Sequence, residues 1–216
     1  GCNFVFDLNG YTLSANTYLF SIYNPDTYLI VEDNSANQTG KIECTMSGGA
    51  IFMVEGGRVI IRSGTFIGNG YVSILRIQQA GTAEIVGGYL QSEKSYAVNN
   101  EGLLLISGGV FESMSSNALQ LYTGSALFFG GTFISPQDKP TFRYRQGLID
   151  FAYYPTHPSE GTTPLSELNL EYWGKTMAVN DSLITLPDGY YVMQNNQIVD
   201  KIYEMNKYYF GTGPRA

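Results

Sequence analysis

Apolar and polar residues alternate with a period of two along the first 154 residues, which is the pattern of half-buried β-strands. Glycine interrupts this alternation in a repeating way. Four segments each carry a glycine, six residues, a second glycine and, two residues later, a large apolar side chain; they span 57–66, 81–90, 102–111 and 124–133. The second glycines step by 24, 21 and 22 residues, so the pattern predicts a solenoid with a coil of about 22 residues.

Two earlier segments, 3–10 and 27–34, fit the same spacing with substitutions: Asn3 replaces the first glycine of one, and Thr27 and Asn34 replace both glycines of the other. Asparagine tolerates a positive φ, so Asn3 and Asn34 are expected at corners. Inside each unit, the second and fourth residues after the first corner are apolar and are predicted to face inward. These inward positions hold Leu29, Val31, Val59, Ile61, Ala83, Ile85, Leu104, Ile106, Ala126 and Phe128. The residue two after each second glycine starts the next inward column, with Phe66, Leu90, Phe111 and Phe133.

A further strand-like stretch precedes each first glycine, as in AIFMVE, SILRIQ and ALQLYT. Three short strands per repeat, joined at glycine corners, describe one coil of a parallel β-solenoid. We therefore predict an all-β fold, with a parallel β-helix of about 6–7 coils over residues 1–154. Neighbouring coils stack about 4.8 Å apart, so Glu32 is expected beside Arg62 and Leu105 beside Leu127.

Residues 155–216 are predicted to form an aromatic-rich C-terminal cap, packed on the end or the side of the helix. Residues 163–168 are expected to form a short helix with proline at its first position. The stretch GYYVMQNNQIVDKIY is expected to form a β-hairpin that turns at Asn195 and Asn196. Such a cap would protect unpaired strand edges and the outward apolar residues Leu105 and Leu127.

The segments DLNGYTLS, EGGRVIIRSGTF, LLLISGGVF and FFGGTFIS resemble the coils of right-handed parallel β-helix proteins. The resemblance is to the pectate-lyase-like repeat modules found in secreted and surface proteins of Gram-positive gut bacteria, and it covers residues 3 to about 154. It implies an extracellular or cell-surface location, as part of a longer secreted protein. Lyases, hydrolases and adhesins all adopt this fold, so the resemblance does not identify an activity.

Charge and cysteine content exclude several classes of function. Nineteen acidic against 12 basic residues, with no basic cluster, argue against nucleic-acid binding. No run of about 18 apolar residues is present, so no membrane insertion is expected. Cys2 and Cys44 have neither a CxxC pair nor a nearby histidine, which argues against a metal site. They are expected to form either one disulfide or two free thiols.

The sequence contains no convincing set of catalytic residues, and we predict no catalytic residue, no metal and no cofactor. Glycoside hydrolysis needs two facing carboxylates, but Glu84 and Asp150 fall three coils apart, about 14 Å. The β-helix lyases that the chain resembles use acidic calcium ligands, yet Asp26 and Asp33 are expected at opposite corners of one strand. His157, the single histidine, lies in a turn-rich loop.

Binding is the function that the sequence favours. Glycan sites combine aromatic platforms with polar side chains that bond hydroxyls. Candidate platforms are Trp173, Tyr172, Tyr190 and Tyr191, and candidate polar groups along one flank are Asn99 and Asn117, with Gln78, Asn100 and Gln120. We expect a non-catalytic, monomeric, adhesin-like module that presents a face to a glycan or to a host or bacterial surface protein. The alternative is a divergent polysaccharide lyase or hydrolase of the pectate-lyase-like superfamily.

Overall fold

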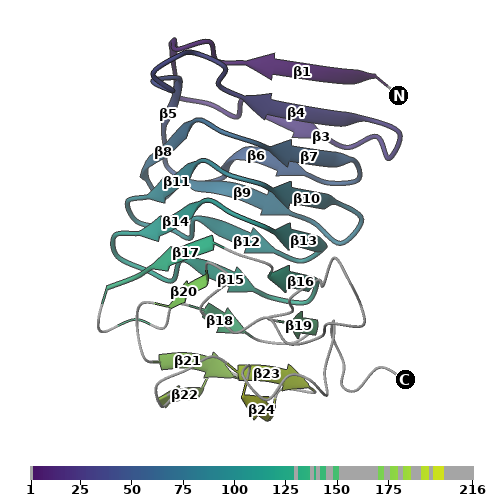
Figure 1. Ribbon diagram of the computed structural model, residues 1–216, viewed down its shortest axis with the longest axis vertical. Helices are drawn as coiled ribbons and strands as arrows, with labels where there is room; N and C mark the ends of the chain where they lie inside the picture. The colour runs from purple at the N-terminus through teal and green to yellow at the C-terminus, as the bar shows by residue number, and fades with distance from the viewer. Residues whose placement is uncertain are drawn as a thin grey trace.

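The computed structural model describes residues 2–128, 131–136 and 139, and the strands 142–144, 148–150, 170–172, 176–179, 182–185, 191–194 and 197–201. Side chains are described for residues 2–126, 131–136, 139 and 143. Across this part of the chain the structure is all-β, without a helix, and its strands stack as a parallel β-solenoid (Figure 1). The predicted fold class is confirmed. The helix expected at 163–168 lies outside the described residues.

Three sheets form the walls of the solenoid, and each coil contributes one strand to each wall. Sheet A contains β1 (Asn3–Asp7), β4 (Tyr28–Glu32), β7 (Arg58–Ile61), β10 (Thr82–Ile85), β13 (Leu103–Ile106), β16 (Ser125–Phe128) and β19 (Leu148–Asp150). Sheet B contains β2 (Thr12–Ala15), β5 (Lys41–Met46), β8 (Thr65–Gly70), β11 (Tyr89–Ser92), β14 (Val110–Ser113), β17 (Gly131–Ile134) and β20 (Leu170–Tyr172). Sheet C contains β3 (Phe20–Ile22), β6 (Ala50–Val54), β9 (Ser73–Ile77), β12 (Val98–Asn100), β15 (Leu119–Leu121), β18 (Phe142–Tyr144), β21 (Thr176–Val179) and β22 (Ser182–Thr185).

The inward columns are buried as predicted. Every inward position from Val59 to Leu104 is fully buried, and Phe66, Leu90, Phe111 and Phe133 form a second buried column. Aromatic rings continue through the interior of the first coils, because Phe20 stacks on Phe52 with ring centroids 5.1 Å apart. Burial of this continuous interior is the main stabilising contribution to the fold.

The two glycines of each repeat are required for different reasons. The second glycines have positive φ, such as 108° at Gly64 and 96° at Gly88, a conformation that L-residues rarely adopt. The first glycines, in contrast, are required by close packing of the coils. A Cβ atom on Gly81 would lie 2.3 Å from the backbone oxygen of Val54 in the preceding coil.

The register corrects the predicted alignment of the first two coils. Asn3 pairs with Tyr28, so Cys2 and not Asn3 occupies the position equivalent to Thr27. Lys41 pairs with Thr65, which places Gly40 at the corner that was assigned to Asn34. A loop of six residues, 34–39, is inserted before that corner, and a constant spacing of glycine and asparagine could not reveal it.

A polar corner joins sheets B and C and was not predicted. The buried Ser92 donates a hydrogen bond from Oγ to the backbone oxygen of Val72 at 2.6 Å and accepts one from the Ser95 amide. One coil later, Ser113 Oγ donates to the backbone oxygen of Ser95 at 2.8 Å. These hydroxyls satisfy backbone groups where the chain leaves one sheet for the next.

Strands from the predicted cap region extend two of the walls. β20 pairs in parallel with β17, and β21 with β18, while β22 turns back antiparallel to β21. The predicted hairpin is confirmed, because β23 (Tyr191–Gln194) and β24 (Gln197–Lys201) pair antiparallel with Gln194 opposite Gln197. The domain boundary at residue 154 and the covering role of residues 155–216 stay predictions.

Candidate functional site

The predicted binding residues do not form one described group. Trp173 and Tyr190 lie outside the described residues, and Tyr172 and Tyr191 belong to strands whose side chains are not described. Asn99 lies at an outward position of β12. Asn117 sits at the corner before β15 and is only 5% exposed. Asn99 therefore lies on an outer face of the solenoid, and Asn117 does not join it.

Asn100 and Asn99 face opposite sides of the same strand. Asn100 is fully buried, donates from Nδ2 to the backbone oxygen of Ser125 at 3.0 Å and accepts from the Gly102 amide at 3.1 Å. These bonds tie two corners together, which gives Asn100 a structural role. Asn99 is thus the residue of this pair whose side chain lies on the outer face of sheet C.

The outer face of sheet C carries a column of polar side chains around Asn99. The register places Arg76 opposite Asn99 on one side and Gln120 opposite it on the other. Arg76, Asn99 and Gln120 are called the polar column below. Since coils rise about 4.8 Å, the column follows the solenoid axis for about 10 Å.

A second row of residues runs beside the polar column. Each member directly follows the last residue of a strand in sheet C. Its members share one backbone pattern, because the amides of Gln78, Glu101 and Tyr122 each donate to the preceding coil at 2.8 Å. Glu55 begins this row and accepts a hydrogen bond from Ser21 Oγ at 3.2 Å. The row thus places carboxylates, an amide and an aromatic ring alongside the polar column.

Few contacts within this surface satisfy the polar column. Arg76 Nη2 lies 3.8 Å from Glu101 Oε1, a long ion pair between half-exposed side chains. Gln78 Nε2 reaches only the sulfur of Met53, at 3.9 Å. Neither contact satisfies the amide oxygens of Asn99 or Gln120.

Each member of the polar column has a buried polar atom without a partner. Among the described residues these atoms are Arg76 Nε, Asn99 Oδ1 and Gln120 Oε1. Gln120 as a whole is 6% exposed. A buried polar atom without a hydrogen bond costs about 1–3 kcal/mol, and native proteins hold few of them. Three such atoms, stacked in successive coils, mark this column as the strongest candidate binding site of the described chain.

Sheet B carries a polar cluster that is satisfied internally. Tyr89 Oη donates to Glu112 Oε2, and Gln91 Nε2 donates to Tyr89 Oη at 2.8 Å and to Glu112 Oε2 at 3.1 Å. Burial, with the hydrogen bond and charge of Glu112, raises the pKa of Tyr89 above its usual value of 10.0. The phenol therefore stays protonated and bonded to its neighbour.

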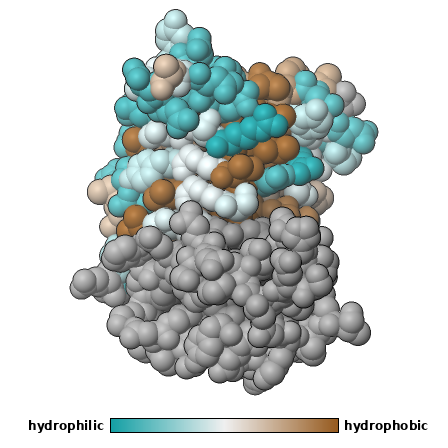
Figure 2. Space-filling model, in the orientation of Figure 1, coloured by the Kyte–Doolittle hydropathy of each residue, from teal (hydrophilic) through white to brown (hydrophobic). Residues whose placement is uncertain are grey.

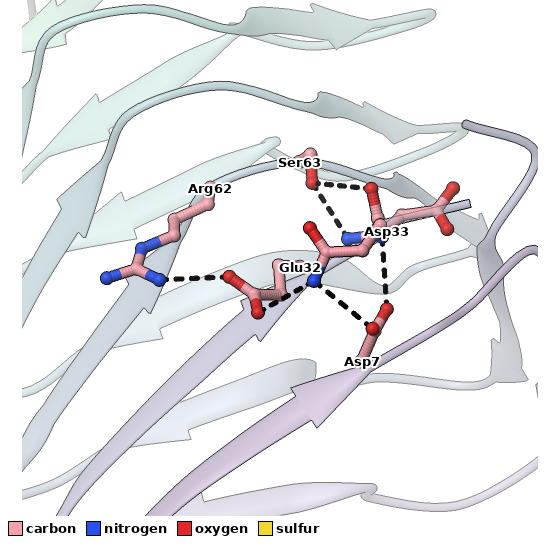
Figure 3. A network of polar contacts seen from close by, with 6 residues as sticks. Asp7, Glu32, Asp33, Arg62 and Ser63 are labelled. Atoms are coloured by element: carbon pink, nitrogen blue, oxygen red, sulfur yellow. Dashed lines mark hydrogen bonds and ion pairs between the residues drawn. The ribbon is translucent and has the colours of Figure 1, made fainter. Parts of the chain in front are cut away.

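The end of sheet A carries a third polar group, shown in Figure 3. The predicted ion pair is confirmed, because Arg62 Nη1 lies 3.0 Å from Glu32 Oε2. Asn34 Nδ2 donates to both Glu32 and Asp7, at 2.9 and 3.1 Å. The side chains of this network satisfy one another across three coils.

Asp33 anchors the inserted loop from inside this network. It is 2% exposed and accepts backbone hydrogen bonds from Gly10, Ser35 and Gly40 at 2.9, 3.2 and 2.5 Å. Burial alone raises the pKa of Asp33, but the hydrogen bonds led by Gly40 outweigh it, and the net pKa lies below 3.8. Asp33 is thus a structural carboxylate that closes the loop 34–39.

The described residues offer little for metal or acid–base chemistry. Within them, no three His, Cys, Asp or Glu side chains gather as ligands for a metal ion. Glu84 and Asp150 occupy the same register position of sheet A, with Leu105 and Leu127 on the two strands between them, as the sequence predicts. No helix of this part of the chain is long and apolar enough to cross a bilayer.

The cysteines are separate in the structure. Cys2 is exposed, Cys44 is buried, and both are free thiols. Cys44 donates from Sγ to the backbone oxygen of Thr17 at 3.5 Å, and burial raises the pKa of its thiol. Of the two possibilities left open by the sequence, the structure shows two free thiols.

Comparisons with family models, with curated proteins and with solved structures give no match to this chain.

Proposed function

We propose that this chain is a non-catalytic β-solenoid module that binds a neutral glycan along the outer face of sheet C. The observation that carries the proposal is the polar column with its three unpaired atoms. Two of these atoms, on Asn99 and Gln120, accept hydrogen bonds, and the third, on Arg76, donates one. Sugar hydroxyls both donate and accept, so they complement all three.

Other ligand chemistries fit the column less well. A phosphate or carboxylate only accepts hydrogen bonds, so it would leave the amide oxygens of Asn99 and Gln120 unmet. Glu55, in the neighbouring row, would repel an anionic polysaccharide, and Glu101 offsets the positive charge of Arg76 that would attract one. The same carboxylates accept hydrogen bonds from neutral hydroxyls, which favours neutral glycans over polyuronates.

The neighbouring row supplies aromatic surface for a sugar ring. Tyr122 belongs to the row. The exposed Tyr23 lies in the coil before Glu55, where a Cβ atom on Gly56 would lie 2.5 Å from the Tyr23 backbone oxygen. An aromatic face meets the C–H bonds of a sugar, while neighbouring polar groups bond its hydroxyls. The rigid coils fix the spacing of these groups in advance, which lowers the entropic cost of binding.

The cellular location of the module and its family resemblance belong to the same proposal. Its glycine-cornered coils resemble pectate-lyase-like repeats, so we place it outside the cell or on the cell surface, as an adhesin-like module. A glycan or a surface glycoprotein is then the partner that it would meet. The proposal assigns no catalytic step to the described residues.

The test is a glycan array probed with the wild-type chain and with two matched variants. Arg76 pairs with Glu101, and Arg58 on sheet A pairs with Glu84, and the two arginines are similarly exposed at 42% and 48%. We expect selective binding of neutral glycans, weakened about tenfold or more by Arg76→Ala and unchanged by Arg58→Ala. A third variant, Trp173→Ala, tests the C-terminal platform that the sequence favoured.

Four outcomes would overturn the proposal. The first is no glycan binding by the wild-type chain, and the second is equal loss in Arg76→Ala and Arg58→Ala. The third is release of shortened or unsaturated sugars on incubation with polysaccharides and calcium, which would show a lyase or hydrolase. The fourth is loss of binding in Trp173→Ala alone, which would move the site away from the polar column.

A further inference from the structure

We propose that the bound glycan carries N-acetylated amino sugars, and that Met53, Arg76 and Asn99 together recognise the acetamido group. The inference rests on the proposed function, because it concerns the ligand of the same face of sheet C. It names the substituent that distinguishes this ligand from a glycan whose only polar substituents are hydroxyl groups.

Met53 extends the outward column of sheet C by one coil. It pairs with Arg76 in the register of β6 and β9, and it is half-buried between the fully buried Phe52 and Val54. Three successive coils therefore present an apolar thioether, a guanidinium group and an amide, on Met53, Arg76 and Asn99. A ligand that lies along the column meets these three groups in that order.

An acetamido group carries three complementary groups in the same order. Its methyl group is apolar, its carbonyl oxygen accepts hydrogen bonds, and its N–H donates one. The methyl group would contact Met53. The carbonyl oxygen would accept from Arg76 Nε and the N–H would donate to Asn99 Oδ1, two atoms that have no partner among the described residues. A hydroxyl group serves either polar atom but leaves Met53 without an apolar contact.

The length of the acetamido group fits the spacing of the coils. Its methyl carbon and its nitrogen lie about 2.4 Å apart, from standard bond lengths. An apolar contact adds about 4 Å at one end, and an N–H···O hydrogen bond adds about 2.9 Å at the other. Together these distances span about 9 Å. The two coil rises between Met53 and Asn99 span about 10 Å.

Apolar side chains beside polar ones are common on this solenoid, as Figure 2 shows for the face in view. In sheet A, for example, the half-buried Ile60 lies between Arg58 and Arg62 in the sequence. Both of these arginines form ion pairs with carboxylates of neighbouring coils. Met53 differs, because the Nε of the adjacent Arg76 has no partner among the described residues. The combination of an apolar contact and an unpaired donor therefore marks this part of sheet C.

Gln78 and Gln120 offer further hydrogen bonds to the same glycan. Gln78 Nε2 lies 3.9 Å from the Met53 sulfur, which is a weak acceptor, so the acetamido carbonyl offers this amide a better one. Gln120 Oε1, also without a partner in the described chain, would accept from a ring hydroxyl. An amino sugar with a free ammonium group fits less well, because an ammonium group accepts no hydrogen bond and cannot satisfy Arg76.

The test compares pairs of glycans that differ only in this substituent. Each pair has one linkage and one chain length, with N-acetylglucosamine against glucose, or N-acetylgalactosamine against galactose. The array identifies the bound pair, and calorimetric titration then measures both dissociation constants. We expect the acetamido member of the bound pair to have a dissociation constant at least about tenfold lower in the wild-type chain.

Three methionine variants locate the methyl contact. Met53→Gln has a similar size but an amide in place of the thioether, so the preference for the acetamido sugar should fall about fivefold. Met53→Leu stays apolar and should keep the preference. Met114→Gln is the matched control, because Met114 is 57% exposed but follows β14 of sheet B, and its preference should equal that of the wild-type chain. Urea unfolding checks that each variant is folded.

The outcomes separate this inference from the proposed function. Equal affinity of the wild-type chain for the two members of the bound pair would overturn the inference and leave the proposed function intact. Binding of no glycan at all would overturn the proposed function itself. A preference that survives Met53→Gln, or that Met114→Gln lowers equally, would overturn the assignment of the methyl contact to Met53.

Discussion

The outer faces of sheets A and C use polar side chains in opposite ways. On sheet A, charges on successive coils pair with one another, Arg58 with Glu84 and Arg62 with Glu32. On sheet C, the polar column leaves one buried polar atom on each of its three members without a partner. Both faces cover the same apolar interior, so the difference lies in the outward residues alone.

This contrast distinguishes polar residues that form ion pairs within the chain from polar residues whose hydrogen bonds we expect a ligand to supply. Surface ion pairs such as those of sheet A contribute little to the free energy of unfolding, but both charged groups of each pair have a partner. The polar column carries an energetic cost that the fold does not require, since apolar residues at the same positions would avoid it. Proteins retain such costs at functional sites.

The largest effect is expected from breaking the interior that both faces share. Leu103 and Leu104 are consecutive in β13, but Leu103 is 37% exposed and Leu104 is fully buried. Leu104→Asp should cost more than about 4 kcal/mol in the free energy of unfolding, because it buries an unpaired charge. Leu103→Asp should cost about 0.5 kcal/mol. Urea unfolding followed by circular dichroism checks this, and a folded Leu104→Asp chain would refute the inward assignment.

A smaller effect is expected at the end of sheet A, where two adjacent carboxylates have different roles. Asp33→Ala leaves three backbone amides without their acceptor and should cost about 3 kcal/mol. Glu32→Ala removes a surface ion pair and should cost about 0.5 kcal/mol. Equal costs in chemical unfolding would show that Asp33 does not anchor the loop.

The pH dependence of stability follows from the same residue. The pKa of Asp33 is lower in the folded state than its usual value of 3.8, so folding favours the ionised form. Its contribution is fully present above about pH 3.8 and is lost as the pH falls through the folded pKa. Unfolding measured between pH 6 and pH 2 should therefore show a shallower acid limb in Asp33→Ala than in the wild-type chain.

Much of the fold could be predicted from the sequence, because its signal is periodic. The spacing of Gly57 and Gly64 repeats with only small changes, and alternation between corners assigns inward residues such as Val59 and Phe66. The antiparallel pairing of β23 with β24 was predictable from the two asparagines between them in the sequence. The loop before Gly40 was not, since an insertion breaks the spacing on which the alignment depended.

The site was harder to predict, because the turns that follow sheet C differ in length. Four residues separate Arg76 from Gly81, but only two separate Asn99 from Gly102. Alignment on the glycines therefore does not place Arg76, Asn99 and Gln120 in one column, although strand pairing does. The sequence predicts Asn99 and Gln120 as binding residues for their amides, but it gives no reason to select Arg76.

The most direct test of the central claim replaces Gln120 with methionine, which has a similar size but no amide. If the column is kept for a ligand, Gln120→Met should raise the free energy of unfolding by about 1 kcal/mol and weaken glycan binding about tenfold or more. The matched control is Gln91→Met on sheet B, which loses two hydrogen bonds and should cost about 1 kcal/mol without changing glycan binding.

Stability and binding should thus change in opposite directions in Gln120→Met, measured by urea unfolding and by calorimetric titration with the glycan selected on the array. A more stable chain that has lost binding is the result that our account predicts. A Gln120→Met chain that is less stable than the wild type and binds the glycan equally well would contradict it.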